Sequence, residues 1–142
     1  MRTVLWRWSP SILVMAAIFS FSHQTGDELS SLLPWFQRLL PHMQSFDWGH
    51  FVAYFGLSAT FVWALGDKRP TIKQKVLAVV LCLLYGITDE FHQQFVEGRM
   101  PDVRDLVNDT IGASLYAGLV RFRPFSIWYG KLPHSLKHSS KY

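Results

Sequence analysis

The chain has 142 residues, of which 49% are hydrophobic, 15% aromatic and 17% charged, and its net charge is +4 at neutral pH. Disordered chains combine low hydrophobicity with high charge, so this composition excludes disorder. It is also more apolar than an ordinary soluble domain, in which about 25% of residues are charged. The single cysteine, Cys82, excludes an intramolecular disulfide and any zinc site built from cysteines.

Four apolar segments follow one another along the chain, at residues 4–21, 48–65, 76–93 and 106–122. Each is close to the length of a membrane-spanning helix, which needs about 20 mainly apolar residues. We therefore predict an all-α polytopic membrane protein, built as a bundle of four transmembrane helices. The basic start of the first segment is also typical of a secretory signal peptide, but no clear small-residue cleavage site follows it.

Apolar residues at helical spacing also occur between the first two segments. This pattern predicts an interfacial helix at about residues 27–40 on the outer leaflet, and Pro34 is expected to kink or divide it. We expect residues 1–124 to form the membrane domain. Residues 125–142 are expected to form a basic, disordered tail.

The basic residues are distributed unequally between the two sides of this predicted bundle. Eleven of them fall on the side of the two termini, and only Arg38, Arg99 and Arg104 fall on the other. Because basic loops stay in the cytoplasm, both termini are predicted to be cytoplasmic. The positive charge then reflects membrane topology, and no nucleic-acid partner is expected.

The acidic residues show the opposite distribution, with nine of ten on the outer side or in the outer parts of the helices. Membrane orientation does not require this, since acidic residues contribute little to it. Ionisable groups inside a membrane normally face the bundle interior or a water-filled cavity. Polar residues also recur at helical spacing, as in Asp47, His50 and Tyr54. We therefore predict an outward-facing polar cavity, with interhelical hydrogen bonding as the alternative.

The candidate site residues come from three helices and the loops beside them: Asp47, His50, Tyr54, Asp89, Glu90, His92, Gln93, Arg99, Asp105 and Asn108. Among these, four offer acid–base groups or ligands for a divalent metal ion: Asp47, His50, Glu90 and His92. Arg99 could bind an anionic group such as phosphate. The others are expected to line a substrate site. No fixed metal-binding spacing such as H-E-x-x-H is present.

The run GITDEFHQQFVEGR at residues 86–99, followed by DLVNDTIG at 105–112, resembles the signature of the VanZ-like membrane protein family. So does the motif of Asp47, His50, Phe51 and Tyr54, and the resemblance covers about residues 12–120. Trp48 departs from it, since the family often has Lys there. The resemblance implies a multi-pass protein of the bacterial plasma membrane, with a link to resistance against the glycopeptide teicoplanin. It does not imply a particular reaction.

Three functions are compatible with these residues. The first is an enzyme that acts on an envelope lipid or cell-wall precursor, with or without a divalent metal ion. The second is a non-catalytic protein that binds or shields a lipid-linked precursor or a glycopeptide. The third is a small proton-coupled transporter, although the predicted cytoplasmic halves of the helices are apolar at residues 76–84 and 113–120. Membrane lipids are expected partners in each case.

Overall fold

The computed structural model describes residues 2–39, 47–65 and 70–120. It contains five helices: α1 (Arg2–Ser22), α2 (Gly26–Leu39), α3 (Asp47–Leu65), α4 (Ile72–Gln93) and α5 (Val103–Leu119). The described residues form no strand, which confirms the all-α prediction. The predicted tail at residues 125–142 lies outside the described part of the chain.

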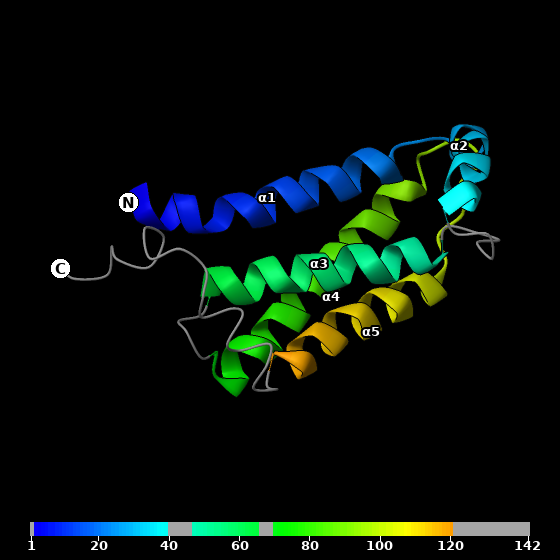
Figure 1. Ribbon diagram of the computed structural model, residues 1–142. Helices are drawn as coiled ribbons and strands as arrows, with labels where there is room; N and C mark the ends of the chain where they lie inside the picture. Colours follow the sequence, from blue (N-terminus) through cyan, green and yellow to red (C-terminus); the bar gives the residue numbers. More distant parts are fainter. Residues whose placement is uncertain (1, 40–46, 66–69, 121–142) are drawn as a thin grey trace.

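The four long helices form a bundle, and α2 lies across one end of it (Figure 1). Helix α3 is the central element, since it packs most extensively on α5 and also contacts α1 and α4. The connection between α4 and α5 lies at the same end as α2 (Figure 1). Among the helices that the structure describes, none combines the length and hydropathy that the criterion for a membrane-crossing helix requires.

Local signals explain where α4 and α5 begin. Thr71 and Gln74 form a reciprocal capping box, so α4 begins at Ile72, before the predicted segment at residue 76. Asp102 caps α5 by accepting a hydrogen bond from the Arg104 amide, and α5 begins at Val103 rather than at the predicted residue 106. In both cases polar capping residues start the helix before its apolar stretch. Helix α2 is continuous through Pro34, so of the two alternatives for this residue, a kink or a division of the helix, the division does not occur.

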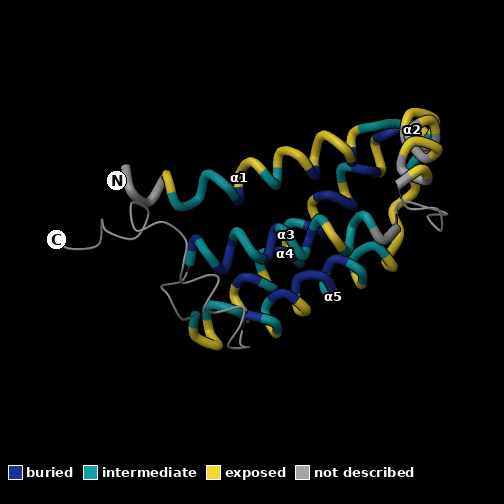
Figure 2. The backbone as a smooth tube through the Cα atoms, viewed as in Figure 1, coloured by how far each residue is buried: buried dark blue, intermediate teal, exposed yellow. Residues whose placement is uncertain are grey.

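The core lies where α3, α4 and α5 meet (Figure 2). Tyr54, Leu57 and Val62 of α3 are completely buried, together with Cys82 of α4. Helices α3 and α5 approach each other closely at Gly112. The backbones are so near there that a Cβ atom on this residue would clash with the Phe51 carbonyl oxygen. Small residues permit this kind of close contact between helices.

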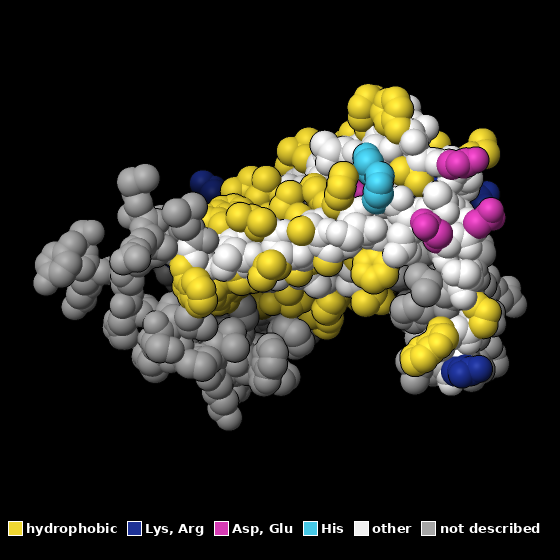
Figure 3. Space-filling view, turned by 90° about the horizontal axis from the view of Figure 1, so that it is seen from above, with side chains coloured by type: hydrophobic (Ala, Val, Ile, Leu, Met, Phe, Trp, Pro, Cys, Tyr) yellow, Lys and Arg dark blue, Asp and Glu magenta, His cyan; other side chains and the backbone are white. Residues whose placement is uncertain are grey.

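Large apolar side chains remain exposed along the outer faces of the bundle, and they dominate the middle of the face in Figure 3. They lie on every long helix and include Ile12, Leu13, Phe19, Val52, Val80, Leu84, Ile87, Phe91, Val107, Ile111 and Leu115. On the same face, Asp and Glu side chains gather at the α2 end (Figure 3). Extensive exposed apolar surface of this kind normally contacts another apolar phase or a partner.

Candidate functional site

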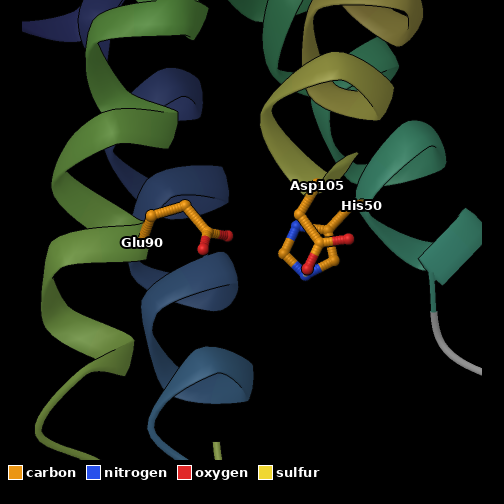
Figure 4. Close-up of side chains that lie close together, drawn as sticks. All are labelled: His50, Glu90 and Asp105. Carbon is orange, nitrogen blue, oxygen red and sulfur yellow. The ribbon is translucent and has the colours of Figure 1, made fainter. Parts of the chain in front are cut away.

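Three ionisable side chains converge at the end of the bundle where α2 lies. His50 is in the first turn of α3, Asp105 is in the first turn of α5, and Glu90 is in the last turn of α4. One ligand atom from each lies within 4.8 Å of the other two. Figure 4 shows the Glu90 carboxylate pointing from α4 toward His50 and Asp105. We call these three residues, with Asp109, the acidic centre.

His50 lies between two carboxylates of α5. Its Nε2 atom is 3.9 Å from Oδ2 of Asp105, and its Nδ1 atom is 3.3 Å from Oδ1 of Asp109. Asp105 and Asp109 are four residues apart, so the helical period places both on the α5 face that meets α3. The two ring nitrogens of His50 therefore face different acidic groups.

Glu90 reaches the same centre from α4. Its Oε2 atom accepts a 3.0 Å hydrogen bond from the Asp102 amide, in the turn that starts α5. Its Oε1 atom is buried and has no hydrogen-bond partner among the described residues. The backbone that caps α5 thus fixes one Glu90 oxygen and leaves the other available to a ligand.

Several other polar atoms of this region are buried without a hydrogen bond to the described residues. They are both carboxylate oxygens of Asp109, Nδ1 of His50 and the Tyr54 hydroxyl oxygen. His50 and Asp109 are each other's partner through the 3.3 Å contact of Nδ1 with Oδ1, which is an ion pair when His50 is protonated. Buried polar groups almost always have partners, so a group of unpartnered ones indicates water, an ion or a ligand.

A glycine makes room for Asp109. A Cβ atom at Gly86 of α4 would lie 2.9 Å from Oδ2 of Asp109 and 3.6 Å from a ring carbon of Tyr54. Real Cβ atoms do not come within 3.0 Å of a non-bonded heavy atom. The Asp109 carboxylate therefore occupies space that is open only because residue 86 is a glycine. Asp109 is 1% exposed and lies deeper in the bundle than Asp105.

The acidic centre has the composition of a divalent-cation site. It holds three carboxylates and one imidazole. Oxygen and imidazole ligands suit cations such as Zn²⁺, Mn²⁺ and Fe²⁺. The three ligand atoms lie within 4.8 Å of one another, so modest side-chain movements would bring them together around one cation. His50, Glu90 and Asp105 fit a cation, and Asp109 adjoins the other His50 nitrogen.

Two predicted site residues lie in a different place, between α1 and α4. Asp89 accepts hydrogen bonds through Oδ2 from the Ser22 hydroxyl at 2.7 Å and from the Gln93 amide at 3.3 Å. The Gln93 amide also lies 3.4 Å from the Ser22 hydroxyl oxygen. All three residues are buried. We call this group the α1–α4 seam. Glu90 and Gln93 are three residues apart on α4, but the structure directs the two side chains to different neighbours.

His92 also faces α1, where its Nε2 atom lies 3.2 Å from Nδ1 of His23. It is absent from the set of converging ligands around His50. The structure therefore does not bring together the two histidines that the sequence analysis paired as metal ligands. Spacing within one helix cannot establish which neighbouring helix a side chain will face.

Three further predicted residues lie near the same end of the bundle. Asp47 is the first residue of α3, and its side chain is outside the described part of the structure. Asn108 lies beside Asp109 on α5, and Arg99 lies in the connection between α4 and α5. Neither of these two side chains has a hydrogen bond or ion pair with a described residue.

The candidate set omitted two residues that have polar neighbours in the structure. Asp109 is four residues from Asp105, and this spacing is the sequence signal that favours it. His23 follows α1, and no pattern in its own segment reveals its contact with His92, because the partner comes from another helix.

The comparisons with known proteins give one match. No curated protein and no solved structure matches the chain significantly. The model of the VanZ/LLP1 family matches residues 8–125, a range that includes α2, α3, α4, α5 and most of α1. This match confirms the resemblance found in the sequence, and the VanZ family is membrane-associated. The chain belongs to the VanZ/LLP1 family.

Proposed function

We propose that this chain is an integral membrane protein of the bacterial envelope whose acidic centre binds a divalent cation and acts on a phosphorylated envelope lipid or lipid-linked cell-wall precursor. One observation carries the proposal. His50, Glu90 and Asp105 offer converging ligands, and buried oxygens beside them have no partner among the described residues. A purely structural polar group would be expected to satisfy these atoms internally.

Membrane insertion is supported by the exposed apolar side chains on α1, α3, α4 and α5 and by the membrane association of the family. In the proposed arrangement these four helices cross the bilayer. The excess of basic residues beside the termini supports a cytoplasmic location for both ends. Helix α2 and the acidic centre then lie at the outer surface, where cell-wall precursors are used.

The proposed chemistry is metal-assisted hydrolysis of a phosphate ester. A cation held by His50, Glu90 and Asp105 would polarise a phosphoryl oxygen and bind the attacking water. Water adds to phosphorus, the bond from phosphorus to the lipid oxygen breaks, and the leaving oxygen takes a proton. The Glu90 carboxylate oxygen that does not bind the cation could accept the proton of the water and pass it to the leaving oxygen. Arg99, in the connection at the same end of the bundle, could bind the phosphate.

The link of the family to teicoplanin fits a site that alters or binds a cell-wall precursor. A non-catalytic protein would use the same cation to bridge its carboxylates and the phosphate without breaking a bond. Proton-coupled transport is less well supported, because the buried residues of the other half of the described bundle are mainly apolar, as at Val62, Ala78 and Ala113.

The first experiment measures the divalent metal content of the protein purified in mild detergent without chelator. Wild type is compared with His50→Ala and Asp105→Asn, and Asp27→Asn serves as the matched control. Asp27 is an exposed carboxylate in the first turn of α2, outside the acidic centre. We expect one more bound cation per chain in wild type and Asp27→Asn than in the other two variants.

The second step incubates the same four proteins with vesicles that contain a polyprenyl monophosphate and measures released phosphate. Cation-dependent release that is lost with His50→Ala supports the enzyme. Cation-dependent binding of the lipid without release would establish the non-catalytic alternative. A metal content that is the same in wild type and in His50→Ala would contradict the proposal as a whole.

A further inference from the structure

A second group of metal-binding side chains lies outside the acidic centre. His23 immediately follows α1, and His92 is in the last turn of α4. Nδ1 of His23 lies 3.2 Å from Nε2 of His92, and the ring centroids are 5.3 Å apart. The planes of the two rings differ by 23°. Two imidazole nitrogens from separate parts of the chain therefore face each other at short range.

This pair is distinct from the acidic centre. Glu90 and His92 are two residues apart on α4, and side chains at that spacing do not share a helix face. Glu90 faces the start of α5, as its hydrogen bond with Asp102 shows, whereas His92 faces the end of α1. Among the described residues, no Asp, Glu or Cys joins the two histidines in a group of converging ligands.

Neighbouring contacts hold the two rings in place. The Phe19 ring packs against His92 at a centroid distance of 4.4 Å and stacks on His23 at 6.1 Å. Ser22 and Gln93, the chain neighbours of the two histidines, belong to the buried hydrogen-bond network of the α1–α4 seam. The backbones on both sides of the pair are therefore fixed by contacts that do not involve the imidazoles.

We propose that His23 and His92 form a second cation site, a two-histidine clamp for a divalent transition metal such as Zn²⁺. Tetrahedral Zn²⁺ with Zn–N bonds of about 2.0–2.1 Å holds two ligand nitrogens about 3.3 Å apart. The observed 3.2 Å separation of the two nitrogens matches this distance, and a turn of the rings would direct both lone pairs at one cation. Without a cation, one imidazole donates a hydrogen bond to the other. On binding, that hydrogen moves to the other nitrogen of the same ring, so no proton is lost.

The composition of the clamp predicts which cations it takes. Imidazole nitrogen suits Zn²⁺, Cu²⁺ and Ni²⁺, whereas Mg²⁺ and Ca²⁺ prefer oxygen ligands. Two protein ligands leave the other coordination positions to water, since His23 is exposed. The clamp is thus an open, exchangeable site that joins α1 to α4. It differs from the acidic centre, which offers three carboxylates and one imidazole.

The test counts Zn²⁺ bound to the full-length protein in detergent, after removal of metal with a chelator, by equilibrium dialysis. The background carries His134→Ala and His138→Ala, because histidines four residues apart can bind metal by themselves. Into this background we place His23→Gln, His92→Gln or His50→Ala. Glutamine keeps a hydrogen-bonding side chain at the site and removes the imidazole ligand. Thermal unfolding without metal verifies that each variant folds.

We expect two Zn²⁺ per chain in the background, one in each single variant, and none in His50→Ala combined with His92→Gln. Zn²⁺ should also raise the Tm of His50→Ala, and this increase should disappear with His92→Gln. If both glutamine variants bind as much Zn²⁺ as the background, the inference is wrong and the histidines form only a hydrogen bond. If His50→Ala binds as much Zn²⁺ as the background and both glutamine variants bind less, the clamp is supported and the acidic centre does not bind Zn²⁺. His23→Gln decides the question should His92→Gln fail to fold.

Discussion

The two polar groups at the α2 end of the bundle differ in how completely their side chains are paired. In the α1–α4 seam, Oδ2 of Asp89 accepts two hydrogen bonds, and the donors Ser22 and Gln93 also contact each other. Only Oδ1 of Asp89 is buried there without a partner among the described residues. In the acidic centre, both oxygens of Asp109 and one of Glu90 are buried without hydrogen-bond partners among the described residues. The seam thus has the features of a structural contact. The acidic centre has more buried oxygens without a partner, which favours a ligand-binding site.

Helix α4 contributes to both groups within one turn. Asp89 and Glu90 are adjacent in sequence, yet Asp89 meets α1 and Glu90 meets the start of α5. If the comparison is correct, substitutions in the seam should change folding stability, and substitutions in the acidic centre should change cation binding. The predictions below separate these effects, beginning with the largest.

Replacing His50 with Ala should have the largest effect, a loss of cation affinity at the acidic centre of more than about 100-fold. His50 is the only nitrogen ligand of the group, and its two nitrogens face two different carboxylates. Titration of metal-free protein with Mn²⁺ measures the change. Mn²⁺ prefers oxygen ligands, so it should bind the acidic centre more tightly than the two-histidine site. Unchanged Mn²⁺ affinity would refute the assignment.

Replacing Asp89 with Leu should lower the free energy of unfolding by about 2–4 kcal/mol. The change leaves the buried Ser22 hydroxyl and Gln93 amide without their acceptor, and each unsatisfied group costs about 1–3 kcal/mol. Denaturant unfolding in detergent measures this loss. Asp89→Asn is the matched control, since it keeps one acceptor oxygen and should lose less. A large loss of Mn²⁺ affinity with no loss of stability would reverse the roles assigned to the two groups.

Replacing Asp109 with Asn should weaken the cation affinity of the acidic centre about 10–100-fold, the usual effect of removing a carboxylate that contacts a ligating histidine. Without metal, we expect the free energy of unfolding to stay constant or rise, because the change removes a buried carboxylate that lacks a hydrogen-bond partner among the described residues. Paired measurements of Mn²⁺ affinity and unfolding test both parts. A clear loss of metal-free stability would show that Asp109 serves the fold.

Replacing Tyr85 with Phe should have the smallest effect, a loss of about 0.5–1.5 kcal/mol in the free energy of unfolding. The Tyr85 hydroxyl donates a 2.6 Å hydrogen bond to the Met15 carbonyl. This bond links α4 to α1 on the side of the seam that lies farther from α2. Cation affinity at the acidic centre should not change. Denaturant unfolding and Mn²⁺ titration of the same preparation verify this, and a loss of affinity beyond about threefold would contradict the separation of the two groups.

The sequence predicted the helices well because each carries its own signal. Apolar length identified α1, α3, α4 and α5, and apolar spacing identified α2 at residues 27–40, close to its observed bounds. The starts of α4 and α5 were placed too late, since the prediction followed apolar content. Capping by Thr71 and Asp102 determines those starts. The crossing of the membrane remains a proposal.

The candidate site was harder to predict because it depends on contacts between helices. The sequence analysis placed His50, Glu90 and Asp105 among the polar residues of one predicted cavity, and the structure brings these three together. The same reasoning grouped His92 with them, although the structure places it beside His23. Depth along a helix is encoded locally, whereas the direction of a side chain around the bundle depends on which helix packs there.

Two glycines join the start of α2 to the connection between α4 and α5. The Gly26 amide donates a 3.2 Å hydrogen bond to the Glu97 carbonyl, and a Cβ atom on Gly26 would lie 2.6 Å from the Gly98 carbonyl oxygen. Gly98 has a φ of +73°, which favours glycine. Neither segment can therefore be lengthened or shortened alone without breaking this backbone contact. An inserted epitope or fluorescent reporter would disturb both connections here, so such labels belong at a chain end.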